Sequence, residues 1–222
     1  MTLQNQIDQA IAKNDLERAD RKRSGKMNPS AFGFCYRKQY WQRLAEPETN
    51  SVPPRVKRIG VIGKAIEDAA LKLIGAKRTQ VLIEDDDVKG FADLAEAGDT
   101  VTEFKSVHSA QFHHTQRDSY DFATQKIHNI LQVMTYVKYL KKVWGKLVFI
   151  SRDDLCIDEP VFHIDRWLPE VDKEIATNKA YWEKKELPPA IPRLFISQKT
   201  PRKECETYCS FKDKCYKMEG LE

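Results

Sequence analysis

Long apolar runs, an excess of charge of one sign and internal repeats are all missing from this chain of 222 residues. No stretch approaches the roughly eighteen apolar residues of a membrane-spanning helix, and residues 1–26 contain no apolar run of signal-peptide length. The 37 basic and 33 acidic residues leave a net charge of only +4, which excludes a polycation that coats nucleic acid indiscriminately. We expect a soluble, cytoplasmic protein without a membrane partner, in which any nucleic-acid site is a local patch.

The length and the spacing of apolar residues predict one α/β domain preceded by a polar segment. Residues 1–27 are polar and basic, and their few apolar residues predict a peripheral helix or arm. Residues 28–222 are expected to form the domain. Within it, helical spacing covers residues 28–46, 59–73, 119–143 and 167–186, the last as an exposed helix. Alternating or compact apolar patterns predict three short strands in residues 79–107 and two further strands at 146–151 and 161–164.

The second and third predicted strands bring two acidic residues together. A turn centred on Gly98 places Asp93 opposite Glu103, and strand alternation puts Lys105 on the face that carries Glu103. Facing carboxylates destabilise a sheet by roughly 0.2–1 kcal/mol. Because Mg²⁺ binds one or two carboxylates and leaves positions for water and phosphate, a divalent cation between them would remove this cost. The hairpin therefore predicts a metal site suited to phosphodiester hydrolysis, with Lys105 orienting the attacking water.

Two helices offer further groups to this site. Glu67 lies four residues after Gly63, where glycine would let the helix approach the sheet, and it is the candidate third metal ligand. Gln132 and Tyr136 lie one turn apart on the polar stripe of the 119–143 helix, so both can reach one ligand. An isolated helical glutamate or polar stripe is more often an ordinary solvated surface.

Four of the five cysteines are candidate metal ligands. Cys35 lies near the start of the chain, while Cys205, Cys209 and Cys215 crowd its end, so four thiolates could join the two terminal segments. Their spacing alone allows either an iron-sulfur cluster or a structural Zn²⁺ site. The fifth, Cys156, is interpreted as a small buried apolar residue.

A basic and aromatic stretch follows Cys35 directly. On a helix its side chains could contact the phosphates of a single DNA strand and stack on its bases, or pack their rings inward with the cations outside. The candidate DNA-binding residues are Arg37, Lys38, Tyr40 and Trp41.

In order and approximate spacing, these motifs resemble the PD-(D/E)XK nuclease superfamily and specifically its RecB-like branch. The Cys35 helix and the three-cysteine tail resemble the iron-sulfur members of that branch, such as the CRISPR-associated Cas-four exonucleases and their viral relatives. The resemblance spans about residues 28–217 and departs from the family at Glu67, where histidine is usual, and in the wider first gap of the tail. Its motifs are Gly63 with Glu67, Gly90-x-x-Asp93, Glu103-x-Lys105, Gln132-x-x-x-Tyr136 and the four cysteines.

The resemblance implies a restriction-endonuclease-like core, with a mixed central sheet flanked by helices and the terminal segments joined by a 4Fe-4S cluster. It also implies Mg²⁺ or Mn²⁺ bound by Glu67, Asp93 and Glu103, with Gln132 and Tyr136 positioning the strand or Lys105. The implied activity is metal-dependent exonucleolytic, and also endonucleolytic, hydrolysis of DNA that is single-stranded or has free ends. Proteins of CRISPR adaptation, recombination or replication are the implied partners, in antiviral defence among other settings.

Two other readings remain open from the sequence. The first is a non-catalytic, metal-stapled module that holds DNA ends for a partner enzyme. A binding surface gains nothing from carboxylates near phosphate, so the acidic pair argues against it. The second is a structural zinc protein without a nucleic-acid role, which leaves the placement of Asp93 opposite Glu103 unexplained.

Overall fold

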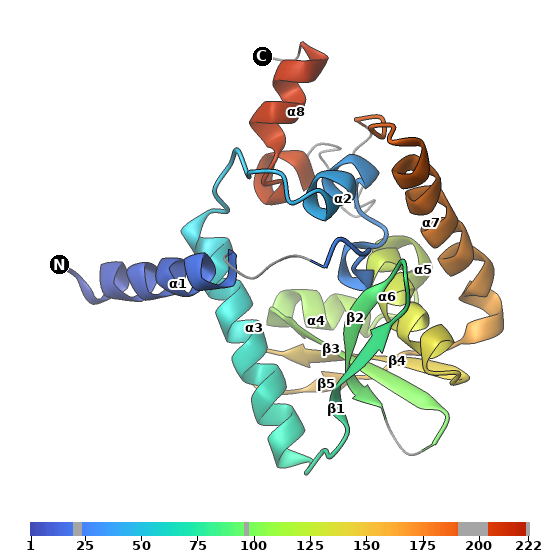
Figure 1. Cartoon of the computed structure of the whole chain (residues 1–222). Coiled ribbons are helices and arrows are strands. Elements are labelled where there is room, and N and C mark those ends of the chain that lie inside the picture. Colours follow the sequence, from blue (N-terminus) through green and yellow to red (C-terminus); the bar gives the residue numbers. More distant parts are fainter. Residues whose placement is uncertain (20–23, 96–97, 191–203, 221–222) are drawn as a thin grey trace.

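A mixed β-sheet forms the centre of the fold (Figure 1). The computed structural model describes residues 1–19, 24–95, 98–190 and 204–220. In this part of the chain the strand order is β1-β2-β3-β4-β5, with β6 also paired to β4, and only β3 and β4 run parallel. The strands are β1 Thr79–Glu84, β2 Lys89–Ala95, β3 Thr100–Val107, β4 Trp144–Ser151, β5 Ile157–Asp158 and β6 Val161–His163.

Helices cover both faces of the sheet. Helix α3 (Pro54–Leu73) packs against β3 on one face, and α6 (Ile127–Tyr139), backed by α7 (Ile164–Lys184), packs on the other. Strand alternation produces this division, because Val101 and Val107 join the α6 core while Ser106 meets α3 at Gly63. A Cβ added at Gly63 would lie 3.1 Å from Ser106 Oγ, so glycine does allow the close approach predicted for α3.

The helix predicted over residues 28–46 is two helices. A 3₁₀ turn at Pro29–Ala31, capped by Asn28, is followed by α2 (Tyr36–Arg43), for which Cys35 is the N-cap residue. Gly33 separates them, since its φ of +82° cannot continue a helix and an added Cβ would lie 2.8 Å from the Cα of His128.

The long helix predicted over residues 119–143 is also interrupted. Helix α5 (Phe122–Gln125) ends at Lys126, whose backbone leaves the helical region, and α6 begins directly after it. Helix α4 (Ser109–Thr115) and β5 had no predicted counterpart. The exposed helix predicted at 167–186 is α7, which is amphipathic rather than peripheral because Trp167, Val171 and Glu174 are buried.

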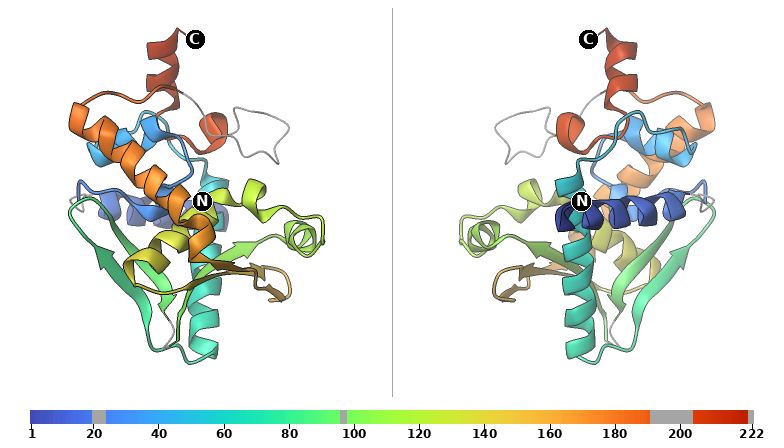
Figure 2. Two further views of the ribbon diagram at one scale, coloured as in Figure 1. Left: turned by 90° about the vertical axis from the view of Figure 1, so that its right-hand side faces the viewer. Right: turned by 90° about the vertical axis from the view of Figure 1, so that its left-hand side faces the viewer.

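The segment that follows α2 lies beside the C-terminal segment at one end of the molecule (Figure 1). The backbone nitrogens of Thr49 and Asn50 donate to the Ser210 carbonyl oxygen at 2.8 and 2.9 Å, which fixes the chain after α2 against the C-terminal segment. That segment comprises a π-helical turn at Glu204–Tyr208 and α8 (Lys212–Glu219), which projects from the end of the molecule (Figure 2).

The polar N-terminal segment forms α1 (Leu3–Ala19), and the Arg58 guanidinium on α3 bonds to Asp8 at 2.6 Å. No described helix combines the length and the apolar character needed to cross a bilayer. Cys156 is exposed, contrary to its interpretation as a buried residue, because it lies in the loop before the two-residue strand β5.

Candidate active site

The β2–β3 hairpin has the register that places Asp93 opposite Glu103. Leu94 pairs with Thr102 and Ala95 with Val101, so the next position brings the two acidic residues face to face. Both side chains are buried. The backbone ladder ends there, since the Asp93 carboxylate itself accepts a hydrogen bond from the Phe104 nitrogen at 2.9 Å. The hairpin thus delivers two buried carboxyl groups to one point where the strands separate.

Glu103 is the centre of a hydrogen-bonded cluster between β3 and α6. Its Oε1 accepts bonds from Lys105 Nζ at 2.5 Å and from Gln132 Nε2 at 2.7 Å, and the Gln132 amide also lies 3.3 Å from the Tyr136 hydroxyl. Its other oxygen, Oε2, is buried without a hydrogen-bond partner among the described residues. The predicted residues on these two elements therefore do meet, and they leave one acceptor of Glu103 available.

Burial dominates the electrostatics of this cluster. It raises the pKa of Glu103 to about 8, an effect that Lys105 opposes and that the nearby Asp93 carboxylate reinforces. Burial alone would lower the pKa of Lys105, but the charges of Glu103, Asp93 and Glu67 and the hydrogen bond to Glu103 together raise it above its ordinary value. Lys105 is therefore a lasting positive charge beside three carboxyl groups.

Glu67 reaches the cluster through Gln80, which the sequence analysis did not identify. The Gln80 amide nitrogen donates to Glu67 Oε1 at 3.2 Å and to Asp93 Oδ1 at 3.1 Å. Gln80 has a φ of +48° in β1, and no pattern in the sequence marks that conformation. Burial and the Asp93 charge raise the pKa of Glu67, whereas its bond to Lys64 at 2.9 Å lowers it.

A cavity of about 350 Å³ lies between α3 and β3, with both Glu67 and Lys105 in its wall. Gly60 and Gly63 form part of the α3 side, so the helix backbone borders the space there. In the part of the chain that the structure describes, no three His, Cys, Asp or Glu side chains converge closely enough to hold an ion. The metal-binding roles of Glu67, Asp93 and Glu103 remain predictions.

Lys126 and His128 add buried basic groups that the sequence analysis did not assign. Burial, with a contribution from the charge of Lys105, lowers the pKa of Lys126 to about 8. Burial and the positive charges of Lys126 and Lys105 likewise lower the pKa of His128 to about 3, which keeps it neutral. The interruption between α5 and α6 places Lys126 in this environment, and helical periodicity could not reveal it.

The four predicted cluster cysteines line one cavity of about 150 Å³ between α2 and the C-terminal segment. Its wall also includes the buried Glu204, whose Oε1 accepts a bond from the Cys35 nitrogen at 3.2 Å. Burial, followed by the proximity of the other thiols and of Glu204, raises the pKa of Cys205 to about 12. The structure thus gathers the thiols of Cys35, Cys205, Cys209 and Cys215, and their role as iron-sulfur ligands stays a prediction.

The four predicted DNA-binding residues have two kinds of surroundings. Arg37 is buried and donates to the Pro188 carbonyl oxygen and to Glu219, both at 2.7 Å. Trp41 is buried against Phe211, with 5.3 Å between ring centroids. Hydrogen bonds and an ion pair therefore hold Arg37 within the fold, and ring packing holds Trp41. Lys38 and Tyr40, in contrast, line a second cavity on the other side of α2.

Comparison with known proteins places the fold. The chain is similar to the crystal structure of SSO0001, with 19% identity and a TM-score of 0.56 over 94% of this chain and 96% of that one. It is also similar to the alkaline exonuclease LHK-Exo from Laribacter hongkongensis, with 19% identity and a TM-score of 0.55 over 76% and 93% of the two chains. The complex of LHK-Exo with dAMP aligns with 16% identity and a TM-score of 0.50 over 72% and 89%. No protein-family model and no curated protein matches the sequence. The mixed sheet flanked by helices is therefore similar in fold to this alkaline exonuclease.

Proposed function

We propose that the protein is a metal-dependent DNA nuclease whose active site is the cluster around Glu103. The observation that supports this proposal most strongly is the environment of the Glu103 carboxyl group. Lys105 and Gln132 hold one of its oxygens, the other is buried without a partner, and Asp93 lies opposite. A buried unsatisfied acceptor is costly in a folded protein and is commonly explained by function or an unseen ion. The fold shared with an alkaline exonuclease supports the same conclusion.

Glu67, Asp93 and Glu103 would hold Mg²⁺ or Mn²⁺. The donor set fits, because all three side chains offer the hard oxygen ligands that these ions prefer, and Gln80 already links Glu67 to Asp93. A bound ion would supply an activated water and neutralise charge on the transferring phosphate. No residue of this set is a soft ligand.

The remaining residues of the cluster would prepare substrate and water. Lys105 is protonated and lines the cavity beside Glu67, so its ammonium group can stabilise negative charge on a phosphate there. Gln132 holds the Glu103 carboxyl group from α6, and Tyr136 in turn contacts the Gln132 amide, so both would orient Glu103 instead of exchanging protons. Lys126 adds positive charge on the same side.

The cysteine cavity would bind a 4Fe-4S cluster that staples α2 to the C-terminal segment. A zinc site needs four sulfurs at about 2.3 Å from one ion. The four thiols line one cavity of about 150 Å³, and the family resemblance favours the cluster as its occupant. Zinc remains the competing occupant in the test described below.

The substrate would be DNA that is single-stranded or has free ends, in the cytoplasm and in the setting of CRISPR adaptation, viral replication or recombination. The test is digestion of labelled single-stranded and duplex oligonucleotides, with each end blocked in turn, in Mn²⁺ and in EDTA. We expect Mn²⁺-dependent cleavage by the wild type and none by Lys105→Ala or Glu103→Gln. Lys138→Ala is the control, because Lys138 is an exposed lysine of α6 that pairs with Asp172.

A wild type that binds these oligonucleotides but never cleaves them would overturn the proposal and favour the non-catalytic DNA-end-binding module. Cleavage by a contaminant-free Lys105→Ala preparation would instead show that the protein is a nuclease whose active site lies elsewhere.

A further inference from the structure

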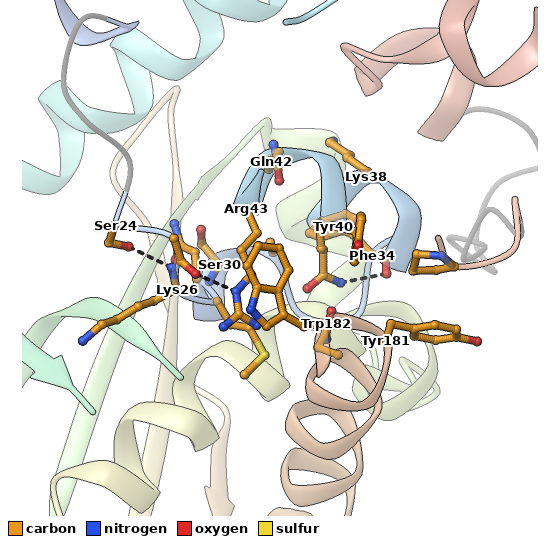
Figure 3. A pocket seen from close by; sticks show the side chains of 17 residues that line it. Ser24, Lys26, Ser30, Phe34, Lys38, Tyr40, Gln42, Arg43, Tyr181 and Trp182 are labelled. Carbon is orange, nitrogen blue, oxygen red and sulfur yellow. Dashed lines mark hydrogen bonds between the residues drawn. The ribbon is translucent and has the colours of Figure 1, made fainter. Parts of the chain in front are cut away.

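A second cavity, of about 330 Å³, lies between α2 and the C-terminal part of α7 (Figure 3). Residues of the segment before the 3₁₀ turn complete its wall. The side chains that line it include cations and aromatic rings but no aspartate or glutamate within the described part of the chain. The residues used in the argument are Phe34, Lys38, Tyr40, Arg43 and Trp182.

Arg43 is the central group of this cavity. Its side chain is only 9% exposed, and its Nε donates to the Gly25 carbonyl oxygen at 2.6 Å. Its Nη2 lies 3.8 Å from Asp87, a carboxylate that Lys179 already binds at 2.6 Å. The Nη1 group has no hydrogen-bond partner among the described residues. A buried guanidinium nitrogen without a hydrogen-bond partner is an unsatisfied donor that an anionic oxygen would satisfy.

Flat aromatic surfaces surround this guanidinium. The Arg43 Cζ lies 4.0 Å from the centre of the Trp182 ring, and Tyr40 meets the same indole edge-on, with 5.6 Å between centroids. Figure 3 shows these side chains converging from α2 and α7. Stacking on aromatic and guanidinium planes is how proteins hold nucleobases without regard to sequence.

We propose that this cavity binds a phosphorylated nucleoside, with the phosphate at Arg43 Nη1, the base against Tyr40 and Trp182, and Lys38 adding positive charge from the cavity wall. Lys38 donates to the Tyr208 carbonyl oxygen at 3.0 Å, and its ammonium group retains further N–H donors. The choice of a nucleotide as ligand rests on the proposed function, since a DNA nuclease binds nucleotides as units of its substrate strand and releases them as products.

The site is distinct from the carboxylate cluster. Its wall is formed by α2, α7 and residues 24–31, whereas the cluster is formed by β2, β3, α3 and α6. The two are linked through Phe34, which lines the cavity and packs on His128 with 4.9 Å between ring centroids.

The test is calorimetric titration of full-length protein carrying Lys105→Ala, in EDTA, with thymidine 5′-monophosphate, thymidine, inorganic phosphate and a short oligothymidylate. We expect saturable binding of the monophosphate and weaker binding of thymidine and phosphate, each of which keeps only part of the contacts. Arg43→Gln should weaken monophosphate binding about tenfold or more, since it removes a charge-assisted hydrogen bond. Trp182→Leu should weaken binding of the monophosphate and of thymidine.

Arg166→Gln is the matched control, because Arg166 also lies over a tryptophan of α7, Trp167 at 5.5 Å, but outside the cavity. Should Arg43→Gln fail to fold, Lys38→Gln on the exposed edge gives the same comparison. If the site holds units of a strand, the oligothymidylate should bind more tightly than the monophosphate. If it holds free nucleotides, the oligothymidylate should bind no more tightly. Absence of saturable binding by any probe, or unchanged affinity in both variants, would overturn the inference. Neither result would affect the proposed nuclease, whose test is cleavage.

Discussion

The Asp93 carboxylate accepts a hydrogen bond from the Phe104 backbone nitrogen at 2.9 Å, just beyond the last paired residues of β2 and β3. A side chain thus takes the place of the backbone ladder where the strands separate. The other oxygen of the carboxylate accepts the Gln80 amide at 3.1 Å. Asp93 therefore has a structural role as a hydrogen-bond acceptor. In the proposed active site it also has a chemical role, which is to supply negative charge.

Substitutions of Asp93 should separate these two parts. Asp93→Asn retains an oxygen for the Phe104 nitrogen but loses the charge, so we expect a folded, inactive protein. Asp93→Ala leaves a buried N–H unsatisfied and should lower the free energy of unfolding by about 1–3 kcal/mol as well. Urea denaturation and the oligonucleotide assay measure the two effects. Equal stability of the two variants would show that the hydrogen bond has no structural value.

Gly63 should tolerate no larger side chain without loss of activity. A Cβ there would lie 3.1 Å from Ser106 Oγ, so Gly63→Val should push α3 away from β3 and carry Glu67 with it. We expect at least a tenfold loss of cleavage, measured as initial rates in Mn²⁺, with a modest fall in melting temperature. Gly60→Ala is the control. Gly60 lines the same cavity, nothing lies within 4 Å of its added Cβ, and alanine stabilises a helix interior by up to about 1 kcal/mol.

The cysteines allow a paired test of the cluster. Cys205→Ser should bleach a brown protein and lower its melting temperature, because a ligand that joins the C-terminal segment to α2 is lost. Cys156→Ser should change neither, since Cys156 is exposed and remote from that cavity. Absorption spectra and metal analysis measure the outcome, and a colourless wild type containing zinc would contradict the cluster assignment.

His128 should make the protein acid-labile. Its pKa lies at about 3 in the folded chain, below the ordinary value of 6.5, because burial and Lys126 disfavour the charged ring. Between these values the unfolded chain binds the proton and the folded chain does not, so stability is fully present above pH 6.5 and falls with decreasing pH. The maximal slope is about 1.4 kcal/mol per pH unit. His128→Phe keeps the contact with Phe34. Its free energy of unfolding, measured by urea titration, should rise relative to that of the wild type as the pH falls from 6.5 to 4. A constant difference would contradict this.

The sequence predicted the elements that have a strong period and missed those decided by tertiary contacts. Helix α3, the three-stranded meander and β4 follow from apolar spacing, and the hairpin register follows from its turn. The breaks at Gly33 and Lys126 do not, because Gly33 is required by its contact with His128 and Lys126 by its burial near Lys105. Local propensity does not record such distant partners.

The candidate site divides in the same way. Asp93, Glu103, Lys105, Gln132 and Tyr136 were predicted and lie together, although their catalytic roles stay predictions. Gln80 could not be predicted, since its function depends on a left-handed backbone conformation in β1 and on two carboxylates from other elements. The second cavity was not predicted, although Lys38 and Tyr40 in its wall were candidate DNA-binding residues. Arg43 and Trp182 are 139 positions apart and meet only in the fold.

Helix α2 separates the cysteine cavity from the second cavity, and Lys38 lines both. Loss of the proposed cluster would therefore loosen α2 first, while the carboxylates on the sheet stay where they are. Protein that has lost the cluster should still hydrolyse substrate supplied at high concentration, yet fail at low concentration. Exposure to air would then raise the substrate concentration needed for cleavage rather than abolish cleavage.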